Sequence, residues 1–502
     1  MMLDTPCAGS IVALPAAGRT PGPHRHEAAA MIRAVAFGSV SESREVGESI
    51  GYQLRRLRRL RGMTQEELAD RADISRDLVA KLEQGRRQTA RLSSLTKFAR
   101  ALDVELSTLV ERTMSVPGTV ASETASPAAL PNPGRCSGAI GRDVPELSFA
   151  LGRCEPRDAA WVVQRLVGED VALSLAGIAQ LVHEWLVVEP PQLAEPRAGR
   201  RIGNGLVDRV ERRVEQLRYI DDFVGGRDLH ELVARELRVT IGLLKSAAYT
   251  DELGRRLLIA VGELCQLAGW VASDADLSSA AQRYYLAAMR AADGAGDRPL
   301  AAQAISSLAY QTANSDDPRT AVVLARSAYE GARGTATATT QALLLERVAW
   351  AHARAGELAQ TERALDAVDR AFEERRPADD PPWVYWLDRD EIDVMAGRCY
   401  TELRRPAEAV PLLSAVLERY GDSRAREAAL YTSWLAESHL QAGEIDRAGA
   451  AAIRVLEFAD RVNSARSDER LAYLHRALGP HRDIASVRAF DERYRSDRSL
   501  SD

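Results

Sequence analysis

Apolar residues recur three and four positions apart through most of the chain, which is the spacing of amphipathic helices. Short amphipathic segments begin abruptly after residue 45. Five of them fit helices, at residues 47–61, 65–72, 76–84, 92–102 and 106–112. Thr64 predicts an N-cap for the second, with Glu67 completing a capping box, and Ser75 predicts the N-cap of the third. Gly62 and Gly85 stand where helices are expected to end.

Two segments lack this periodicity. Residues 1–45 are rich in Ala, Pro, Gly and Ser, which predicts a disordered tail; the alternative is that the protein begins downstream, for instance at Met31. Residues 113–145 are rich in proline and hold few large apolar side chains, which predicts a flexible linker. A chain of 502 residues is also too long for one core, so several domains are expected.

Beyond the linker the pattern predicts an all-α body, with a helical region over 146–250, repeats over 251–480 and a C-terminal tail over 481–502. The repeat is a small residue, a turn position seven later and a further small residue five beyond that. The five triplets are Gly269–Asp276–Ala281, Ala309–Asp316–Ala321, Ala349–Gly356–Thr361, Gly397–Arg404–Ala409 and Ala436–Gly443–Ala448. Successive turn positions are 40, 40, 48 and 39 residues apart.

Small residues at facing positions let two antiparallel helices approach closely, and the turn between the helices tolerates glycine or aspartate. The pattern resembles tetratricopeptide-type repeats in a degenerate form, with a period longer than the usual length of about 34 residues. The resemblance implies an α-solenoid. The alternative is one irregular bundle of alanine-rich helices.

The segment from Thr64 to Gly85 shares one apolar core between two helices and leaves a polar outer face on the second. The core positions are Leu68, Ala69, Ile74, Val79 and Leu82. The outer positions are Arg76, Asp77, Ala80, Lys81 and Gln84, which are polar or short enough to reach base edges in a major groove. Arg86, Arg87 and Arg91 follow, where a loop would run along a phosphate backbone.

These residues resemble the helix-turn-helix of the Xre (Cro/C1-type) regulators, over residues 46–112. The resemblance implies a five-helix, lambda-repressor-like DNA-binding domain. It makes Gln65 a phosphate or base contact, adds Ser75 to the interface, and makes Arg76, Asp77 and Lys81 the base readers. Asp73 replaces the usual glycine of the turn, and no proline follows the basic loop. The alternative is a small helical bundle without affinity for DNA.

The arginine run from Arg55 to Arg61 falls on several faces of a helix, so not all of its side chains can touch DNA. In the Xre family the arginine that matches Arg58 pairs with the glutamate that matches Glu83. The resemblance therefore implies a structural ion pair between the first and third helices.

Charge separates the chain into two parts. Residues 47–112 hold 14 basic and 10 acidic side chains, a net charge of +4, whereas residues 113–502 hold 48 and 58, a net charge of −10. A small basic module joined to a large acidic body indicates two roles, although the net charge of −6 for the whole chain does not by itself indicate a nucleic-acid binder.

Other chemistry is not indicated. The five scattered cysteines never form a C-x-x-C pair, and the eight histidines lack metal-binding spacing, so neither a disulfide scaffold nor a metal is expected. No phosphate-binding loop or catalytic triad motif is present, so no cofactor and no enzyme activity are expected. Apolar runs fall short of the roughly 20 residues of a membrane span. The expected location is the cytoplasm, with the nucleoid as the site of the DNA-bound protein.

The segment from Pro381 to Trp386 gathers three aromatic residues in an aromatic-poor chain. A wedge that fills a gap between repeats is the favoured interpretation, and a pocket lining or partner contact is the alternative.

The order of the parts resembles actinomycete regulators that join an Xre-type module to a tetratricopeptide-like region. The resemblance implies sequence-specific binding of double-stranded DNA and control of transcription. We expect the repeats to sense a peptide, protein or small molecule, and to hold a homodimer, because one helix-turn-helix contacts only one half-site. An alternative is an interaction scaffold whose helix-turn-helix is vestigial or a docking module.

Overall fold

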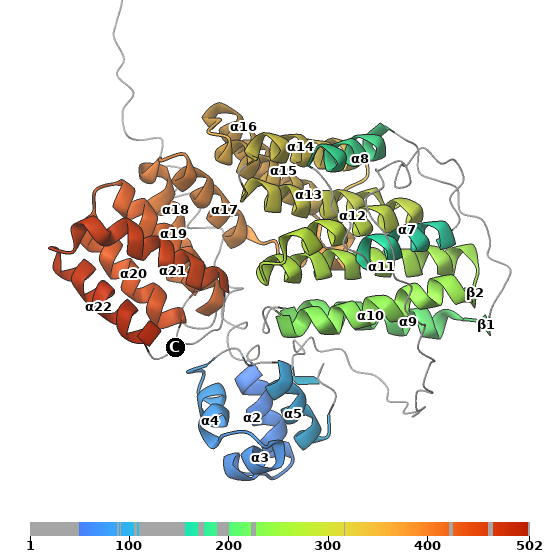
Figure 1. Cartoon of the computed structure of the whole chain (residues 1–502), viewed down its shortest axis with the longest axis horizontal. Coiled ribbons are helices and arrows are strands. Elements are labelled where there is room, and N and C mark those ends of the chain that lie inside the picture. The colour runs from blue at the N-terminus through green and yellow to red at the C-terminus, as the bar shows by residue number, and fades with distance from the viewer. Residues whose placement is uncertain are drawn as a thin grey trace, which may run out of the picture. The chain divides into compact units, whose positions relative to one another are not determined.

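A computed structural model of the chain describes residues 50–87, 90, 92–104, 108–109, 156–168, 175–187, 200–221, 227–315, 317–420, 425–459 and 465–499. Helices dominate these residues (Figure 1). The strands among them are β1 (Arg200–Arg201) and β2 (Ala247–Ala248), which form one parallel pair. The prediction of an all-α chain is confirmed for this part. The predicted tail at 1–45 and linker at 113–145 lie outside the described residues.

The N-terminal module contains α2 (Ile50–Leu60), α3 (Gln65–Ala72), α4 (Arg76–Glu83) and α5 (Leu92–Leu102). They correspond to the first four predicted helices, and of the fifth only residues 108 and 109 are described, as helical. Leu54, Leu68, Val79, Leu82 and Phe98 are buried together, so each helix contributes an apolar face to one small core. Burying each such side chain contributes about 1.5–3 kcal/mol, which offsets the marginal stability of helices this short.

Local capping sets the ends of these helices. The Thr64 hydroxyl accepts the Glu67 N–H at 3.1 Å and the Glu67 carboxylate accepts the Thr64 N–H at 2.7 Å, so the predicted capping box is present. Ser75 caps α4 by accepting the Leu78 N–H. Asp73 adopts the left-handed conformation, with φ of 51°, in the turn where the Xre pattern usually has glycine.

Four further helices occupy the predicted helical region. They are α7 (Pro156–Gly168), α8 (Leu175–Val187), α9 (Asn204–Asp221) and α10 (Arg227–Ser246). Helices α9 and α10 pack against α11 (Asp251–Asp274), α7 against α12 (Ser278–Ala295), and α8 against α14 (Pro318–Ala332). This region therefore covers part of the helical hairpins that follow it.

The five predicted helix pairs are present as helical hairpins. The first is α11 with α12. The others are α13 (Arg298–Ala313) with α14, α15 (Ala338–Arg354) with α16 (Leu358–Glu373), α17 (Arg389–Glu402) with α18 (Pro406–Tyr420), and α19 (Ala425–Gln441) with α20 (Ile445–Ala459). The first helices of successive hairpins contact one another in chain order, from α11 to α19 (Figure 1).

The small residues of the repeat stand where two helices come closest. A Cβ atom at Gly269 would lie 2.6 Å from the ring of Tyr285, and one at Gly397 would lie 2.7 Å from Leu413. The turn positions have positive φ, at Asp276 (61°), Gly356 (73°), Arg404 (55°) and Gly443 (76°). The remaining turn position, Asp316, lies outside the described residues. The repeat pattern thus follows from close approach and left-handed turns.

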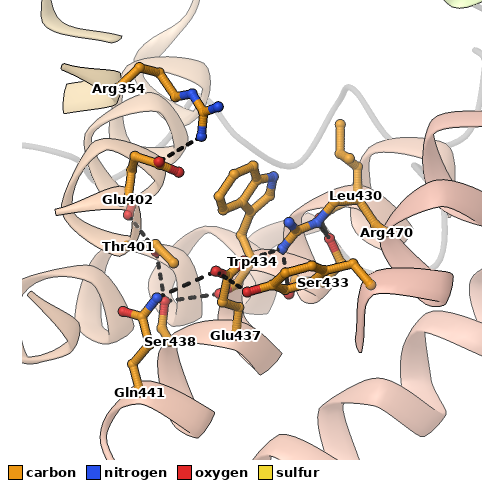
Figure 2. A network of polar contacts seen from close by, with 12 residues as sticks. Arg354, Thr401, Glu402, Leu430, Ser433, Trp434, Glu437, Ser438, Gln441 and Arg470 are labelled. Carbon is orange, nitrogen blue, oxygen red and sulfur yellow. Dashed lines mark hydrogen bonds and ion pairs between the residues drawn. The ribbon is translucent and has the colours of Figure 1, made fainter. Parts of the chain in front are cut away.

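Polar contacts also join neighbouring hairpins, as Figure 2 shows. An Arg354 guanidinium N–H donates to Glu402 at 2.6 Å, between α15 and α17. The hydroxyls of Thr401 and Ser438 lie 2.7 Å apart, between α17 and α19. Arg470, in α21 (Ala465–Leu478), donates to Glu437 of α19 at 2.6 Å. Such buried or half-buried bonds fix which residues of adjacent helices face each other.

The prediction of a tail at 481–502 is wrong for most of that segment. Residues Ala485–Ser499 form α22, which packs on α20. Val487 and Phe490 are buried, and Tyr494 stacks on His475 with ring centroids 4.3 Å apart. These three residues lie three and four positions apart on one helix face, a signal that the many arginines and aspartates of the segment obscure.

One described helix, α11, is long and apolar enough to cross a membrane by length and composition. Within the apolar window of that helix, 72% is buried inside the protein, which is typical of a core helix.

The segment between α16 and α17 accounts for the long repeat spacing of 48 residues. It contains two short 3₁₀ helices, η2 (Pro377–Asp379) and η3 (Pro382–Val384). Trp383 and Val384 are buried, as a wedge requires, and Trp383, Tyr385 and Trp386 also line a cavity. Both interpretations of this aromatic segment hold in part.

Candidate nucleic-acid interface

Helix α4 presents one apolar and one polar face. Val79 and Leu82 are buried in the core of the module. The side chains predicted as base readers, Arg76, Asp77 and Lys81, are exposed on the other face. Gln84 is exposed after the end of α4, and Ala80 is half-buried. Because Val79 and Leu82 are held in the core, the polar face of α4 is turned away from it.

Two of these side chains pair with each other. The Lys81 Nζ lies 2.8 Å from an Asp77 carboxylate oxygen, one turn apart on α4. Their side chains are 51% and 70% exposed, so water screens the pair. An exposed i,i+4 pair contributes only about 0.3–0.5 kcal/mol, a small cost to release Lys81 for another partner.

The module also contains a buried ion pair. Arg58 of α2 donates to both carboxylate oxygens of Glu83 in α4, from Nε at 2.5 Å and from Nη2 at 2.8 Å. Its Nη1 donates to the carbonyl of Met63 at 2.6 Å. Burial alone would raise the pKa of Glu83, but the hydrogen bonds from Arg58 and Gln65 hold it below its ordinary value. The pair therefore fixes α2 against α4, as the resemblance implied.

Gln65 was expected to contact DNA, but its side chain forms a hydrogen bond within the module. Its Nε2 donates to Glu83 at 2.8 Å, and the side chain is half-buried. This N–H thus completes the bonding of the buried carboxylate at the start of α3. Contact between Gln65 and DNA stays a prediction.

The basic loop after α4 is described only in part. Arg86 is exposed and Arg87 is half-buried. The backbone N–H of Arg87 donates to the carbonyl of Lys81 at 3.0 Å, which holds the start of the loop against the end of α4. Arg91 lies outside the described residues.

Two structural features of the module escaped the sequence pattern. Gly51 of α2 touches the α4 backbone: a Cβ atom there would lie 1.8 Å from the carbonyl oxygen of Leu82. A glycine inside a predicted helix was the available signal. Arg61, at the end of the arginine run, donates to the carbonyls of Leu102 and Asp103 and so joins α2 to the end of α5.

The described residues hold no group of three or more His, Cys, Asp or Glu side chains that fits a metal ion. His352 and His439, which share one repeat position, are buried, and each Nδ1 lies 2.6 or 2.7 Å from a glutamate just past the following turn. Cys265 and Cys399 are buried free thiols whose pKa is raised by burial.

Comparison with known proteins agrees with the geometry of the N-terminal module. Residues 54–109 match the family model described as Helix-turn-helix. The comparison with curated proteins found no match. The matched range runs from within α2 to beyond α5 and so includes both α3 and α4. Residues 54–109 therefore form a DNA-binding helix-turn-helix domain of the Cro/C1 type.

Proposed function

We propose that this protein is a sequence-specific transcription regulator of the actinomycete Xre type, acting in the cytoplasm by binding and not by catalysis. The observation that carries the proposal is the exposed polar face of α4, with Arg76 and Lys81, in a domain matched by a helix-turn-helix family model. An exposed recognition helix of this composition suits the major groove of double-stranded DNA. Ser75, Asp77, Ala80 and Gln84 complete the proposed reading face, and Arg86, Arg87 and Arg91 the phosphate contacts.

The helical hairpins support the second half of the proposal, that residues 251–480 are a tetratricopeptide-like solenoid that senses a signal and holds a homodimer. Their first helices contact one another in chain order, which gives a repeat array long surfaces for ligands and for a second copy. A dimer places two helix-turn-helix domains on paired half-sites about one helical turn of DNA apart.

Selection of bound fragments from genomic DNA with the full-length protein tests the first half. We expect enrichment of a defined site. Arg76→Ala and Lys81→Ala should each weaken binding to that site by about 1–3 kcal/mol, if the side chain pairs with a base. Arg86→Ala should weaken binding to all sequences alike and reduce its salt dependence. Arg370→Ala, an exposed change on α16, is the matched control and should have no effect.

Absence of enrichment, or full affinity in the Arg76/Lys81 double variant with its helicity intact, would contradict this assignment. The first result would favour the interaction scaffold. For the second half, light scattering on residues 146–502 should show a dimer at tens of micromolar. A monomeric fragment with a dimeric full-length protein would place the dimer contact elsewhere.

A further inference from the structure

The first helices of the first three hairpins share an aromatic position that the repeat pattern did not use. The residue just after the small mark is Trp270 in α11, Tyr310 in α13 and Trp350 in α15. The ring centroid of Tyr310 lies 6.2 Å from those of both tryptophans. In α17 the same position is Arg398, whose guanidinium lies 4.7 Å from the ring centroid of Trp350. Successive hairpins thus present one continuous aromatic face.

Trp270, Tyr310 and Arg398 of this face line a cavity of about 240 Å³. The inserted segment before α17 supplies further aromatic walls with Trp383, Tyr385 and Trp386. The ring of Tyr385 also packs edge-on against Tyr219 of α9, with centroids 5.2 Å apart. Aromatic walls with a few convergent polar groups are typical of sites for small molecules.

Two guanidinium groups of the cavity are buried without a carboxylate partner. Arg347 is 7% exposed, and its guanidinium lies 4.7 Å from the ring centroid of Tyr310. Arg398 is 8% exposed; its Nη2 donates to the Tyr310 hydroxyl at 2.7 Å, and its Nε has no hydrogen-bond partner. Within the described part of the chain, neither guanidinium forms an ion pair. Buried charges are costly unless they are paired and hydrogen-bonded, so this cavity suits an anion.

The nearby carboxyl groups do not fill that role. Glu346 is 1% exposed and its Oε1 has no hydrogen-bond partner; burial raises its pKa to about 8, so it is mostly protonated at pH 7. Burial raises the pKa of Glu391 to about 7, and its Oε1 accepts the hydroxyls of Tyr420 and Tyr431. Of the other charged lining residues, Arg218 and Arg466 are paired with Glu263 and Asp274, and the acidic ones are Asp221 and Glu427.

We propose that this cavity binds a small organic anion with a flat aromatic body, its carboxylate on Arg347 and Arg398 and its ring against Trp270, Tyr310 and Trp386. The inference rests on the sensing role proposed above and narrows it to one ligand class. A cavity of about 240 Å³ lies just below the range of about 300–1,000 Å³ typical of ligand sites, which favours a small molecule. Planar guanidinium groups match a carboxylate with two parallel hydrogen bonds, and aromatic walls stack on a flat body.

Binding of charge-matched probes to the full-length protein without DNA tests the site. Indole-3-acetate and benzoate are the anions, and indole-3-acetamide, benzamide and tryptamine are the uncharged and cationic counterparts. We expect at least one anion to quench tryptophan fluorescence saturably and to release heat in calorimetry, with its amide at least tenfold weaker and tryptamine weaker still. Arg347→Gln and Arg398→Gln should each weaken the anion at least tenfold. Arg370→Gln, on the exposed side of α16, is the control and should bind as the wild type does.

Equal affinity for acid and amide, stronger binding of tryptamine, or no binding of either anion would overturn the proposal. The comparison of probes on the wild-type protein does not depend on any variant folding. Because the readout needs no DNA, the two proposals fail separately. If neither anion binds but DNA sites are still selected, the proposed anion site is refuted. If an anion binds but no DNA site is selected, the proposed transcription regulator is refuted.

Discussion

Replacing Glu83 by alanine tests whether the buried pair of the DNA-binding module is structural. The change removes the acceptor of three hydrogen bonds, two from Arg58 and one from Gln65. Among the described residues, Arg58 would keep the Met63 carbonyl as its remaining side-chain acceptor. The side chains of Arg58 and Glu83 are 10% and 2% exposed, so water does not readily replace the lost carboxylate.

The small exposed fractions of these two side chains decide how large the loss of unfolding free energy should be. An exposed ion pair contributes about 0–1 kcal/mol, whereas removing one partner of a buried pair costs about 3–5 kcal/mol. We expect Glu83→Ala to lower the free energy of unfolding of the module by about 3 kcal/mol, near the lower limit because Met63 still accepts one bond. The double variant Arg58→Met/Glu83→Leu leaves no buried charge and should recover most of that loss.

Hydrogen exchange in the full-length protein measures this locally. The backbone amides of α2 and α4 report the opening free energy of the module, and those of α15 serve as an internal reference. DNA affinity measured at low temperature, where the module stays folded, should be nearly unchanged in the double variant. A Glu83→Ala protein with normal exchange that fails to bind DNA would refute the structural role and make Glu83 or a partner a DNA-contacting group.

Other changes have equally definite outcomes. Gly51→Ala should destabilise the module, because α2 must move about 1.2 Å away from α4 to relieve the contact with the Leu82 carbonyl. The overpacking cost of about 1–3 kcal/mol outweighs a gain in helix propensity of about 1 kcal/mol. Hydrogen exchange measures the net change in the stability of the module. Lowering the pH should weaken the same module as Glu83 protonates, because the stabilisation from Glu83 is present above pH 4.5 and lost as the pH falls through its depressed pKa. Exchange in the Glu83→Gln variant should show a weaker dependence, with the rest due to Glu67 and Asp73, whose pKa values are also lowered. The pH dependence of stability that arises from Glu346 has the opposite sign. Its raised pKa means that stability falls as the pH rises from 4.5 to 8, and Glu346→Gln should reduce that fall in thermal melts, while Glu391, whose pKa is also raised, keeps part of it.

The N-terminal module was predictable because its signals are local. A cap such as Thr64 acts within one turn of helix, and the resemblance to Xre regulators adds the longer-range pair of Arg58 and Glu83. The close approach at Gly51 and the bond from Gln65 to Glu83 depend on how three helices meet. A linear pattern does not encode that meeting, so these features were missed.

The hairpins were predictable for a different reason. A small residue facing a large one, as Gly269 faces Tyr285, repeats at a nearly constant spacing, and the left-handed turns admit few residue types. The cavity was hidden because an aromatic residue such as Tyr310 has the same helical spacing as a core residue. The one departure in spacing, 48 residues in place of about 40, marked the inserted segment with Trp383, but only the fold shows which helices that segment faces.

An anion in the cavity would add to contacts that already join non-adjacent hairpins, since Arg398 of α17 donates to the Tyr310 hydroxyl of α13. Tyr310, Arg347 and Arg398 come from α13, α15 and α17, so one ligand held by all three would favour a single spacing of those hairpins. At a ligand concentration 100 times the Kd, binding stabilises that arrangement by about 2.7 kcal/mol. A small change of angle at the interfaces between successive repeats alters the course of a repeat array. A signal would then reach the dimer contact that we propose for the repeats through the hairpins themselves, without any contact between the ligand and the DNA-binding module.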